Sequence, residues 1–311
     1  MDDLVYLFAL SKIARIGQAT VRALLHKFES YPAIFTAPAE ELLKIKRITP
    51  ATAAEIMKSN QHLEELALEL DEIQHNQIQV IPIDSNRYPK LLKNIPDAPM
   101  LIYLMGSIIP EDERSIAIVG SRSASELGQE IAHNLARALV QQGITIISGL
   151  AIGIDTAGHQ GALSADGRTI ACLGSGFSRI YPPENQELAQ QIPQSGAIIS
   201  ELPPKTTVES KFLLMRDRII AGLSKAVIVI ESEEDGGAIY TARKANKYDR
   251  QVLYINWHKF PGVLEEAQSK YIQNYLKETG LPINNIDSAT VSYLVAIAKN
   301  NIDLPELPFD H

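Results

Sequence analysis

The sequence is poor in cysteine and in long apolar runs, and each shortage excludes a class of protein. Its 311 residues include one cysteine, Cys172, in the apolar run TIACLG, so an intramolecular disulfide and a cysteine-based metal cluster are both excluded. No apolar segment approaches the roughly 20 residues that a membrane-spanning helix needs. The N-terminus, MDDLVYLFALSKIARIG, lacks the cationic start of a signal peptide. We therefore expect a cytoplasmic protein without a membrane partner.

Motifs of catalysis and of metal binding are also missing. The chain has neither the G-x-x-x-x-G-K-[ST] loop of P-loop ATPases nor an H-E-x-x-H or comparable ligand spacing, so we expect no metal and no cofactor. Ser148, Asp155 and His159 lie close together in the chain, but no G-x-S-x-G turn surrounds the serine. These residues therefore do not predict a hydrolytic triad. Asp155 is expected to order its loop or a helix start, and His159 to form a hydrogen bond from a helix face.

Negative charge dominates the chain as a whole. The formal net charge is -8, which argues against a nucleic-acid binder that is basic over its whole surface. Two short stretches, residues 205–225 and 243–250, nevertheless each contain three more basic than acidic residues. They indicate a focused track for a polyanion. The alternative is that these basic side chains are solvated on helix faces or form salt bridges with acids inside the protein. Phe212 and Tyr240 lie in or beside these stretches, where they could stack on a base or belong to the core.

Residues 1–75 are predicted to form short helices in a tandem arrangement. IARIGQATVRALLHKF has apolar residues at near-helical spacing around a turn at Gly17, and IKRITPATAAEIM repeats the plan with Pro50 near a helix start. Each half is typical of a helix-hairpin-helix, whose turn amides can take a DNA phosphate. In the second half Thr49 stands where the hairpin glycine is expected. A helical module used for packing or dimer contact is the alternative.

The remaining chain divides into three parts. Residues 76–112 form a connecting segment that leads into a sheet, and residues 113–260 alternate apolar runs with helical stretches. Residues 261–311 are expected to be a helical C-terminal extension without a winged helix. Fully apolar strands between helices predict a parallel sheet covered on both faces. The fold class is therefore α/β, a Rossmann-like, doubly wound, mostly parallel sheet preceded by a helical domain. The expected strands are Ser115–Val119, Ile144–Ser148, Thr169–Leu173, Ala197–Ser200, Ala226–Glu231 and Gln251–Ile255.

The loops after successive strands meet at one edge of such a sheet, and their composition predicts an anion site. Several are rich in glycine and lead into helix N-termini, whose N–H groups and dipole attract negative charge. The turn after the first strand, GSR, adds Arg122, a guanidinium suited to bidentate phosphate contact. With only Gly120 and Gly128 in that turn, the pattern is wrong for a dinucleotide. The glycines of the other loops are Gly149, Gly153, Gly174, Gly176, Gly236 and Gly237.

Ordered motifs between about residues 85 and 250 carry a specific resemblance. They are, in chain order, YPKLLKNIPDAPMLIYLMG, AIVGSR, SGLAIGIDTAGHQGAL, YPPEN, SELPP, FLLMRDRIIAGLS and GGAIYTAR. With them the chain resembles the DNA-processing protein A family, also called Smf, of bacterial single-stranded DNA binders. The helical N-terminus is similar to the SAM-like helix-hairpin-helix domain of that family.

The resemblance implies a protein that is not an enzyme. It would bind single-stranded DNA without sequence preference, protect it during natural transformation and help to load the RecA recombinase onto it. It would also form a homodimer through its Rossmann domain. Backbone amides would line the pocket, cationic side chains would take DNA phosphates and Phe212 would stack on a base. The amides are those of Ser121, Gly149, Gly174 and Gly176, and the cations are Arg122, Lys205, Lys211, Arg216 and Arg218.

Three departures from the family pattern stand out. Asp217 lies between Arg216 and Arg218, where the family usually has asparagine, and it adds negative charge to the phosphate track. After Arg250 the family usually continues into a proline-glycine turn and an asparagine-rich loop, whereas this chain reads VLYINWHKFPGVLEEAQSKY. The residues after Pro261 are too few and too loosely patterned to predict the C-terminal winged helix that many members carry.

Two alternatives belong to other functional classes. One is a LOG-like Rossmann protein that binds a nucleotide or hydrolyses a nucleoside monophosphate, because GGAIYTAR resembles that group as well. The P-G-G-x-G-T-x-x-E pattern of that group supplies a glutamate carboxylate, whereas Thr241 here is followed by Ala242, Arg243 and Lys244. The chain therefore lacks the carboxylate that would act as general acid or base at a glycosidic bond. The other is an interaction protein that kept the fold and lost its DNA site, as Asp217 would suggest.

Overall fold

A computed structural model describes residues 2–232, 236–255, 280–283 and 288–298. Contacts divide the chain into two compact units. The first, called the helical unit below, comprises Met1–Tyr88 and Asp97–Leu104, and the second, the sheet unit, comprises Pro89–Pro96 and Met105–His311. The expected connecting segment, residues 76–112, is therefore shared between the two units.

The helical unit contains the expected short helices. Its second and fifth helices begin after Gly17 and Thr49, and in each preceding turn an arginine, Arg15 or Arg47, has a left-handed backbone (φ 69° and 77°). The Thr49 side chain accepts a hydrogen bond from the Thr52 amide at 3.2 Å, which satisfies one of the unpaired N–H groups of that helix start. The helices are α1 (Asp3–Lys12), α2 (Gln18–Phe28), α3 (Tyr31–Thr36), α4 (Ala39–Leu42), α5 (Pro50–Asn60) and α6 (Leu63–His75).

A core of large apolar side chains holds these helices together. Phe8, Leu24, Ile34 and Ile56 are fully buried, and they come from α1, α2, α3 and α5 respectively. An antiparallel pair follows the helices, in which β1 (Gln79–Pro82) places Ile81 opposite Ile102 of β2 (Leu101–Gly106).

The sheet unit is built on parallel strands, and successive strands are added on both sides of a central pair. From β3 the chain steps through β4 and β5 to β6 on one side and returns to β7 beside β3, after which β8 and β9 extend the other side. The strand order β6-β5-β4-β3-β7-β8-β9 is that of a doubly wound fold whose direction reverses between β3 and β7. The strands are β3 (Ser115–Val119), β4 (Thr145–Ser148), β5 (Thr169–Cys172), β6 (Ala197–Ser200), β7 (Ala226–Val229), β8 (Gln251–Ile255) and β9 (Leu281–Ile283).

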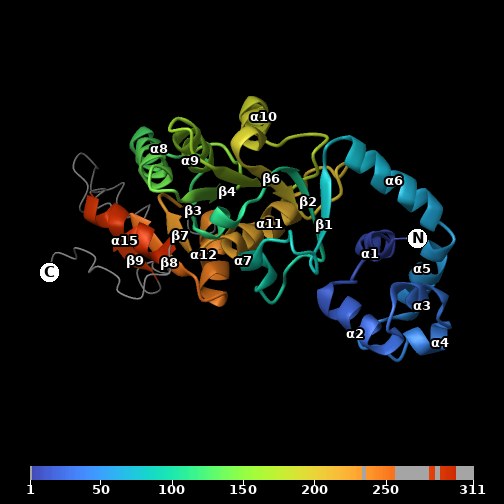
Figure 1. Cartoon of the computed structure of the whole chain (residues 1–311). Helices are drawn as coiled ribbons and strands as arrows, with labels where there is room; N and C mark the ends of the chain where they lie inside the picture. Colours follow the sequence, from blue (N-terminus) through green and yellow to red (C-terminus); the bar gives the residue numbers. More distant parts are fainter. Residues whose placement is uncertain (1, 233–235, 256–279, 284–287, 299–311) are drawn as a thin grey trace. The chain divides into compact units, whose positions relative to one another are not determined.

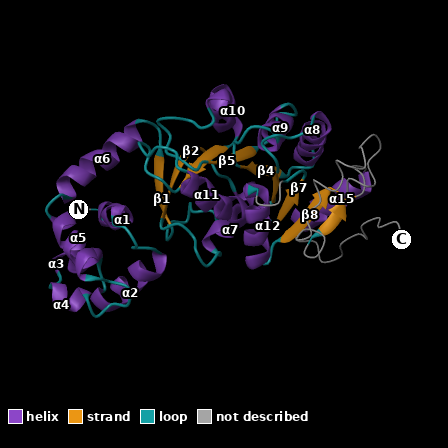
Figure 2. Cartoon of the chain, turned by 180° about the vertical axis from the view of Figure 1, so that it is seen from behind, coloured by secondary structure: helices purple, strands orange, loops and turns teal. Residues whose placement is uncertain are grey.

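Helices cover both faces of this sheet. Helices α8, α9 and α10 lie over one face, and α7, α11 and α12 lie over the other (Figures 1 and 2). Every residue of β3, β4, β5, β6 and β7 is buried, which explains why these strands are apolar throughout. The helices are α7 (Lys90–Lys93), α8 (Glu126–Val140), α9 (Ile154–Leu163), α10 (Gln186–Ser195), α11 (Ser210–Leu223), α12 (Gly237–Lys247) and α15 (Ser288–Ala298), with 3₁₀ turns at Pro110–Glu113 and Pro183–Asn185.

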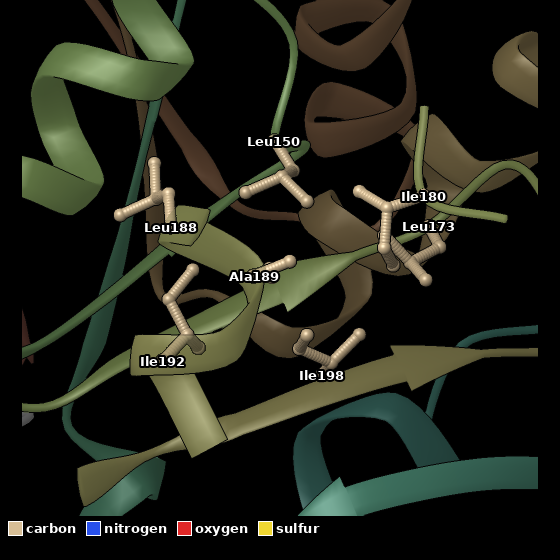
Figure 3. Close-up of a cluster of buried hydrophobic side chains, with 8 residues drawn as sticks. Leu150, Leu173, Ile180, Leu188, Ala189, Ile192 and Ile198 are labelled. Carbon is tan, nitrogen blue, oxygen red and sulfur yellow. The ribbon is translucent and has the colours of Figure 1, made fainter. Parts of the chain in front are cut away.

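One buried cluster ties the loops after β4 and β5 to helix α10. Leu150 and Ile180 come from these loops, and they meet Leu188 and Ile192 of α10 and Ile198 of β6 (Figure 3). Because the loops are held by buried apolar contact, the backbone next to the carboxyl ends of β4 and β5 has a fixed position.

The expectation of a purely helical segment after residue 260 is corrected. Within the described residues of that region, β9 adds a parallel strand beside β8, with Ile283 opposite Ile255. A three-residue strand that contains Pro282 is hard to predict from a sequence, because proline has no backbone N–H to donate to a neighbouring strand. At the edge of a sheet that hydrogen bond is not needed. The helix expected over about residues 263–278 lies outside the described residues, whereas α15 coincides with the one expected from Ser288.

The close contact between α8 and α9 gives a test of the fold. Gly161→Ala on α9 should lower the free energy of unfolding by roughly 1–3 kcal/mol, because the added Cβ would lie 2.8 Å from the Cα and carbonyl carbon of His133 on α8. Gly158→Ala on the same helix is the matched control, since its Cβ would meet Ile118 at an ordinary 3.6 Å. Urea titration of both variants measures the difference, and equal losses would contradict this packing.

Candidate nucleic-acid interface

A pocket of about 450 Å³ opens where the winding of the sheet reverses. The loop after β3 forms one wall, α11 the second, and the residues after β7 with the start of α12 the third. Doubly wound folds bind their ligands at this position, outside the carboxyl ends of the strands. Among the residues that line the pocket are Ser121, Arg122, Asp155, Leu213, Arg216, Asp217, Ile220, Gly237 and Ala238.

Arg216 lies at the base of the pocket and is 5 % exposed. Its Nη1 donates to the carbonyl oxygen of Cys172 at 2.7 Å and to that of Gly149, and its Nε donates to Oδ1 of Asp217 at 3.0 Å. The guanidinium therefore joins the ends of β4 and β5 to α11. Most of its donors are bonded inside the protein, which argues against a role for Arg216 in extending the phosphate track.

Two carboxyl groups share this buried environment. Asp155, at the start of α9, accepts hydrogen bonds at Oδ2 from the amides of Gly149 (3.1 Å) and Ala151 (3.3 Å). Burial raises the pKa of Asp155, with Arg216 acting in the opposite direction. Burial also raises the pKa of Asp217 to about 7, again against the effect of Arg216. Two acids thus face one internal cation beneath the pocket.

The residues that could suggest hydrolysis serve the fold. Ser148 donates from Oγ to the carbonyl oxygen of Ile118 at 2.6 Å, and the Nδ1 of His159 is hydrogen bonded to the Thr169 hydroxyl at 2.6 Å. Burial, with the charge of Arg216, lowers the pKa of His159 to about 3, so the ring is neutral at physiological pH. Burial raises the pKa of the Cys172 thiol to about 12, which leaves it a poor nucleophile.

The expected amide donors behave differently from one another. The Gly149 amide donates to Asp155, and the Gly176 amide donates to the Thr206 carbonyl oxygen at 2.8 Å, so the expectation that these two amides face the ligand is wrong. Gly174 is buried against α11, since an added Cβ would lie 2.8 Å from the Cα of Leu213. Ser121 lines the pocket, and its hydroxyl accepts a hydrogen bond from the Ser123 amide at 3.1 Å.

The expected cations outside the pocket floor lie on its rim and beyond. Arg122 lines the pocket with an exposed side chain. Lys211 is exposed, with Nζ 2.7 Å from a Glu209 carboxylate oxygen and 4.6 Å from the centre of the partly buried Phe212 ring. Lys205 is exposed as well. Arg218 forms an ion pair with Glu201, each side chain being 13 % exposed, so a phosphate there would compete with a carboxylate.

Glu231 is a structural residue that the motifs did not reveal. Its buried carboxylate accepts hydrogen bonds from the amide (2.9 Å) and the hydroxyl of Ser125, the residue that precedes α8. The sequence offered one signal for this role: Glu231 ends an apolar run, and an acid that is buried there needs a hydrogen-bond donor. Glu231 thereby anchors the loop that carries Arg122.

Among the described residues, no group of three or more histidine, cysteine, aspartate and glutamate side chains is placed to hold a metal ion. Nor does the described part of the chain contain a helix long and apolar enough to cross a membrane.

The fold and the pocket define a doubly wound α/β protein with an open pocket at its switch point. The sequence model for DNA recombination-mediator protein A matches residues 79–293, and a model for SAM-like helix-hairpin-helix tandems matches residues 8–59. The chain belongs to the DNA recombination-mediator protein A family.

Curated relatives agree with this assignment. Protein Smf of Synechocystis is 35% identical over 258 residues, which are 82% of this chain and 65% of the relative. DNA processing protein DprA of Bacillus subtilis is 34% identical over 244 residues, 78% of this chain and 82% of the relative. This chain therefore spans slightly less than two thirds of the Synechocystis protein.

Solved structures show the same fold. DNA processing protein A from Streptococcus pneumoniae superposes with a TM-score of 0.72 at 26% identity, covering 92% of this chain and 95% of that one. The Helicobacter pylori protein, whose structure concerns its single-stranded DNA binding mode, gives a TM-score of 0.59 at 26% identity over 72% of this chain and 97% of that one.

The buried position of Arg216 predicts a large effect on stability. Arg216→Ala should lower the free energy of unfolding by roughly 3 kcal/mol or more, because it leaves Asp155 and Asp217 without their cation. Arg137→Ala, which removes an exposed arginine from α8, should change it by less than about 0.5 kcal/mol. Urea titration of both variants decides, and similar values would contradict the structural role of Arg216.

The raised pKa of Asp217 predicts a dependence on pH. In the native state this carboxyl titrates near pH 7, against an ordinary value of 3.8, so the native state binds more protons between these values. Its contribution to stability is present below about pH 4 and is lost as the pH rises through 7. As the pH rises over this range, the free energy of unfolding of Asp217→Asn should increase relative to that of the wild type by roughly 1 kcal/mol per pH unit. Unfolding free energies at several pH values measure this difference. A constant difference would contradict the raised pKa.

Proposed function

We propose that this protein binds single-stranded DNA without sequence preference in its contacts to the sugar-phosphate backbone. It protects the strand and promotes its loading with RecA in natural transformation and recombination. The proposal includes no catalytic step, a cytoplasmic location and a homodimer joined through the sheet unit. RecA and the second copy of the chain are thus the protein partners that it requires.

Arg122 is the observation that carries the proposal. Its side chain is exposed at the rim of a pocket that lies at the switch point of the sheet. Its guanidinium forms no hydrogen bond or ion pair with a described residue, unlike Arg216 and Arg218, which have internal partners. An exposed guanidinium held at a fixed rim suits a phosphate that approaches from solvent.

Further exposed cations in the sheet unit are the reason to propose an extended strand as the ligand in place of a single small anion. Lys211 and Lys205 are exposed on α11 and in the loop before it, and Phe212 lies beneath the Lys211 ammonium. Exposed cations and an aromatic ring are the usual composition of a single-strand groove. The structure of the Helicobacter pylori relative, which concerns single-stranded DNA binding, supports the same ligand.

Family membership is the support for proposing the dimer, the RecA partner and the role in transformation. Relatives at 34% identity are named DNA processing proteins, and the family is that of a recombination mediator. A mediator has to hold the strand without base pairing and give it up to a recombinase. Contacts at the rim of a pocket suit this role, because exposed ion pairs form and break readily.

Substitution of Arg122 tests the proposal. Arg122→Ala should weaken binding to a fluorescent 15-nucleotide oligo(dT) about tenfold, as expected for a hydrogen-bonded charge pair. The slope of log affinity against log salt should fall by about 0.7, the value for one phosphate contact on a single strand. Fluorescence anisotropy over a salt series measures both quantities.

Arg137→Ala is the matched control, since it removes the same charge from the exposed surface of α8, at the end of that helix distant from the pocket. It should leave affinity and slope within about twofold of wild type, in keeping with screening of distant charges. Undetectable or salt-independent binding by the wild type would contradict the proposed function. Displacement of the oligonucleotide by a mononucleotide at micromolar concentration would instead favour the LOG-like alternative.

A further inference from the structure

The floor of the pocket differs chemically from its rim. At the rim stands the exposed cation Arg122, whereas beneath the pocket Asp155 and Asp217 face the single guanidinium of Arg216. When both carboxyl groups are ionised, which for Asp217 requires a pH above about 7, two acids against one base give the floor an excess of negative charge. A phosphate anion is therefore favoured at the rim and disfavoured at the floor.

Asp217 offers an acceptor to whatever enters. The residue is 5 % exposed, and within the described chain its carboxylate accepts one hydrogen bond, at Oδ1, from Arg216. Oδ2 lies on the side of α12, 3.5 Å from where a Cβ on Gly237 would stand. Because Gly237 has no side chain, the space beside Oδ2 stays part of the pocket. Oδ2 can therefore accept a hydrogen bond from a donor of the ligand.

The remaining walls suit a flat, largely apolar group. Leu213 and Ile220 of α11 and Ala238 of α12 line the same pocket, whose volume of about 450 Å³ lies in the range of small-molecule sites. Nucleobases are commonly held in this way, by apolar side chains against the ring and hydrogen bonds to the Watson–Crick edge.

We propose that the pocket receives one unpaired base of the bound strand, that Asp217 reads this base, and that guanine is preferred. The proposal rests on the proposed function, since it assumes that the ligand is single-stranded DNA. The phosphate of the same nucleotide stays at the rim with Arg122. Contacts along the rest of the strand remain independent of sequence.

Guanine matches the floor better than thymine does. Its N1–H and N2–H donors stand side by side and can both be accepted by a carboxylate. Its O6 can accept from Nη2 of Arg216, which has no acceptor among the described residues. Thymine has one donor, N3–H, between two carbonyl oxygens that the carboxylate would repel. Asp217 is thus a specificity-determining residue in a strand-binding site.

The protonation of Asp217 gives the preference a direction with pH. Burial raises its pKa to about 7, with Arg216 and Arg122 lowering it and Asp155 raising it. The ionised carboxylate accepts both guanine donors, whereas the protonated form is itself a donor. The preference for guanine should therefore be greater at pH 8 than at pH 6.

Oligonucleotides that differ at one base test the proposal. Wild-type protein should bind a 15-nucleotide oligo(dT) with one central guanine about five- to tenfold more tightly than oligo(dT) itself at pH 8, a discrimination usual for a bidentate base contact. Hypoxanthine at the same position, which lacks the N2 amino group, should give an intermediate affinity. Asp217→Asn should reduce the guanine preference to less than twofold and leave the salt dependence unchanged.

Asp249→Asn is the matched control, because Asp249 is exposed and lies after the C-terminal end of α12, whose N-terminal end lines the pocket; it should keep the wild-type preference. Equal binding of both oligonucleotides by the wild type would overturn the inference and leave the proposed function standing. A guanine preference that survives in Asp217→Asn would overturn the role of Asp217. Absence of binding to either oligonucleotide would overturn the proposed function itself. If Asp217→Asn does not fold, the hypoxanthine and pH series on the wild type decide.

Discussion

The guanidinium of Arg216 is the contact on which the arrangement of the site depends. It donates to the carbonyl oxygens of Gly149 and Cys172, at the ends of β4 and β5, and to the carboxylate of Asp217 on its own helix. A buried guanidinium is costly unless its hydrogen bonds and charge are satisfied, and here carbonyl dipoles and two acids satisfy them. The same contacts hold α11 against the sheet, so the wall of the pocket and the loops of the strands cannot move independently.

This internal use of Arg216 determines what the rest of the pocket can do. Gly149 must lack a side chain, because a Cβ there would lie 2.7 Å from Asp155 Oδ2 and closer still to the guanidinium. Its amide donates to the same carboxylate, so the glycine loop supports the buried charges instead of a ligand. The exposed positive charge at the pocket is left to Arg122, on a loop that Glu231 holds through Ser125. A protein of net charge -8 can in this way attract a polyanion at one place.

Much of the fold could be predicted from the sequence because it depends on apolar runs, whereas the site depends on hydrogen bonds that a sequence does not display. The run Ser115–Val119 was predicted and coincides with β3, since a strand buried on both faces has to be apolar. Arg216 and Asp217 could not be placed, because two adjacent charges on a helix usually face solvent, and their burial follows from carbonyl groups far away in the chain. β9 was missed since a short edge strand with Pro282 resembles a loop.

Rim and floor together assign an orientation to a bound nucleotide. A phosphate loses favourable hydration when it leaves water, and it recovers this only beside donors or cations. Arg122 offers such a position at the rim, whereas the carboxyl groups below, once ionised, would repel the same group. A base carries no net charge and gains from contact with Leu213, Ile220 and Ala238 as well as from the acceptor on Asp217. The gradient from cation to acid across one pocket therefore favours phosphate outside and base inside, and the buried Arg216 maintains that gradient because it keeps the two acids in place.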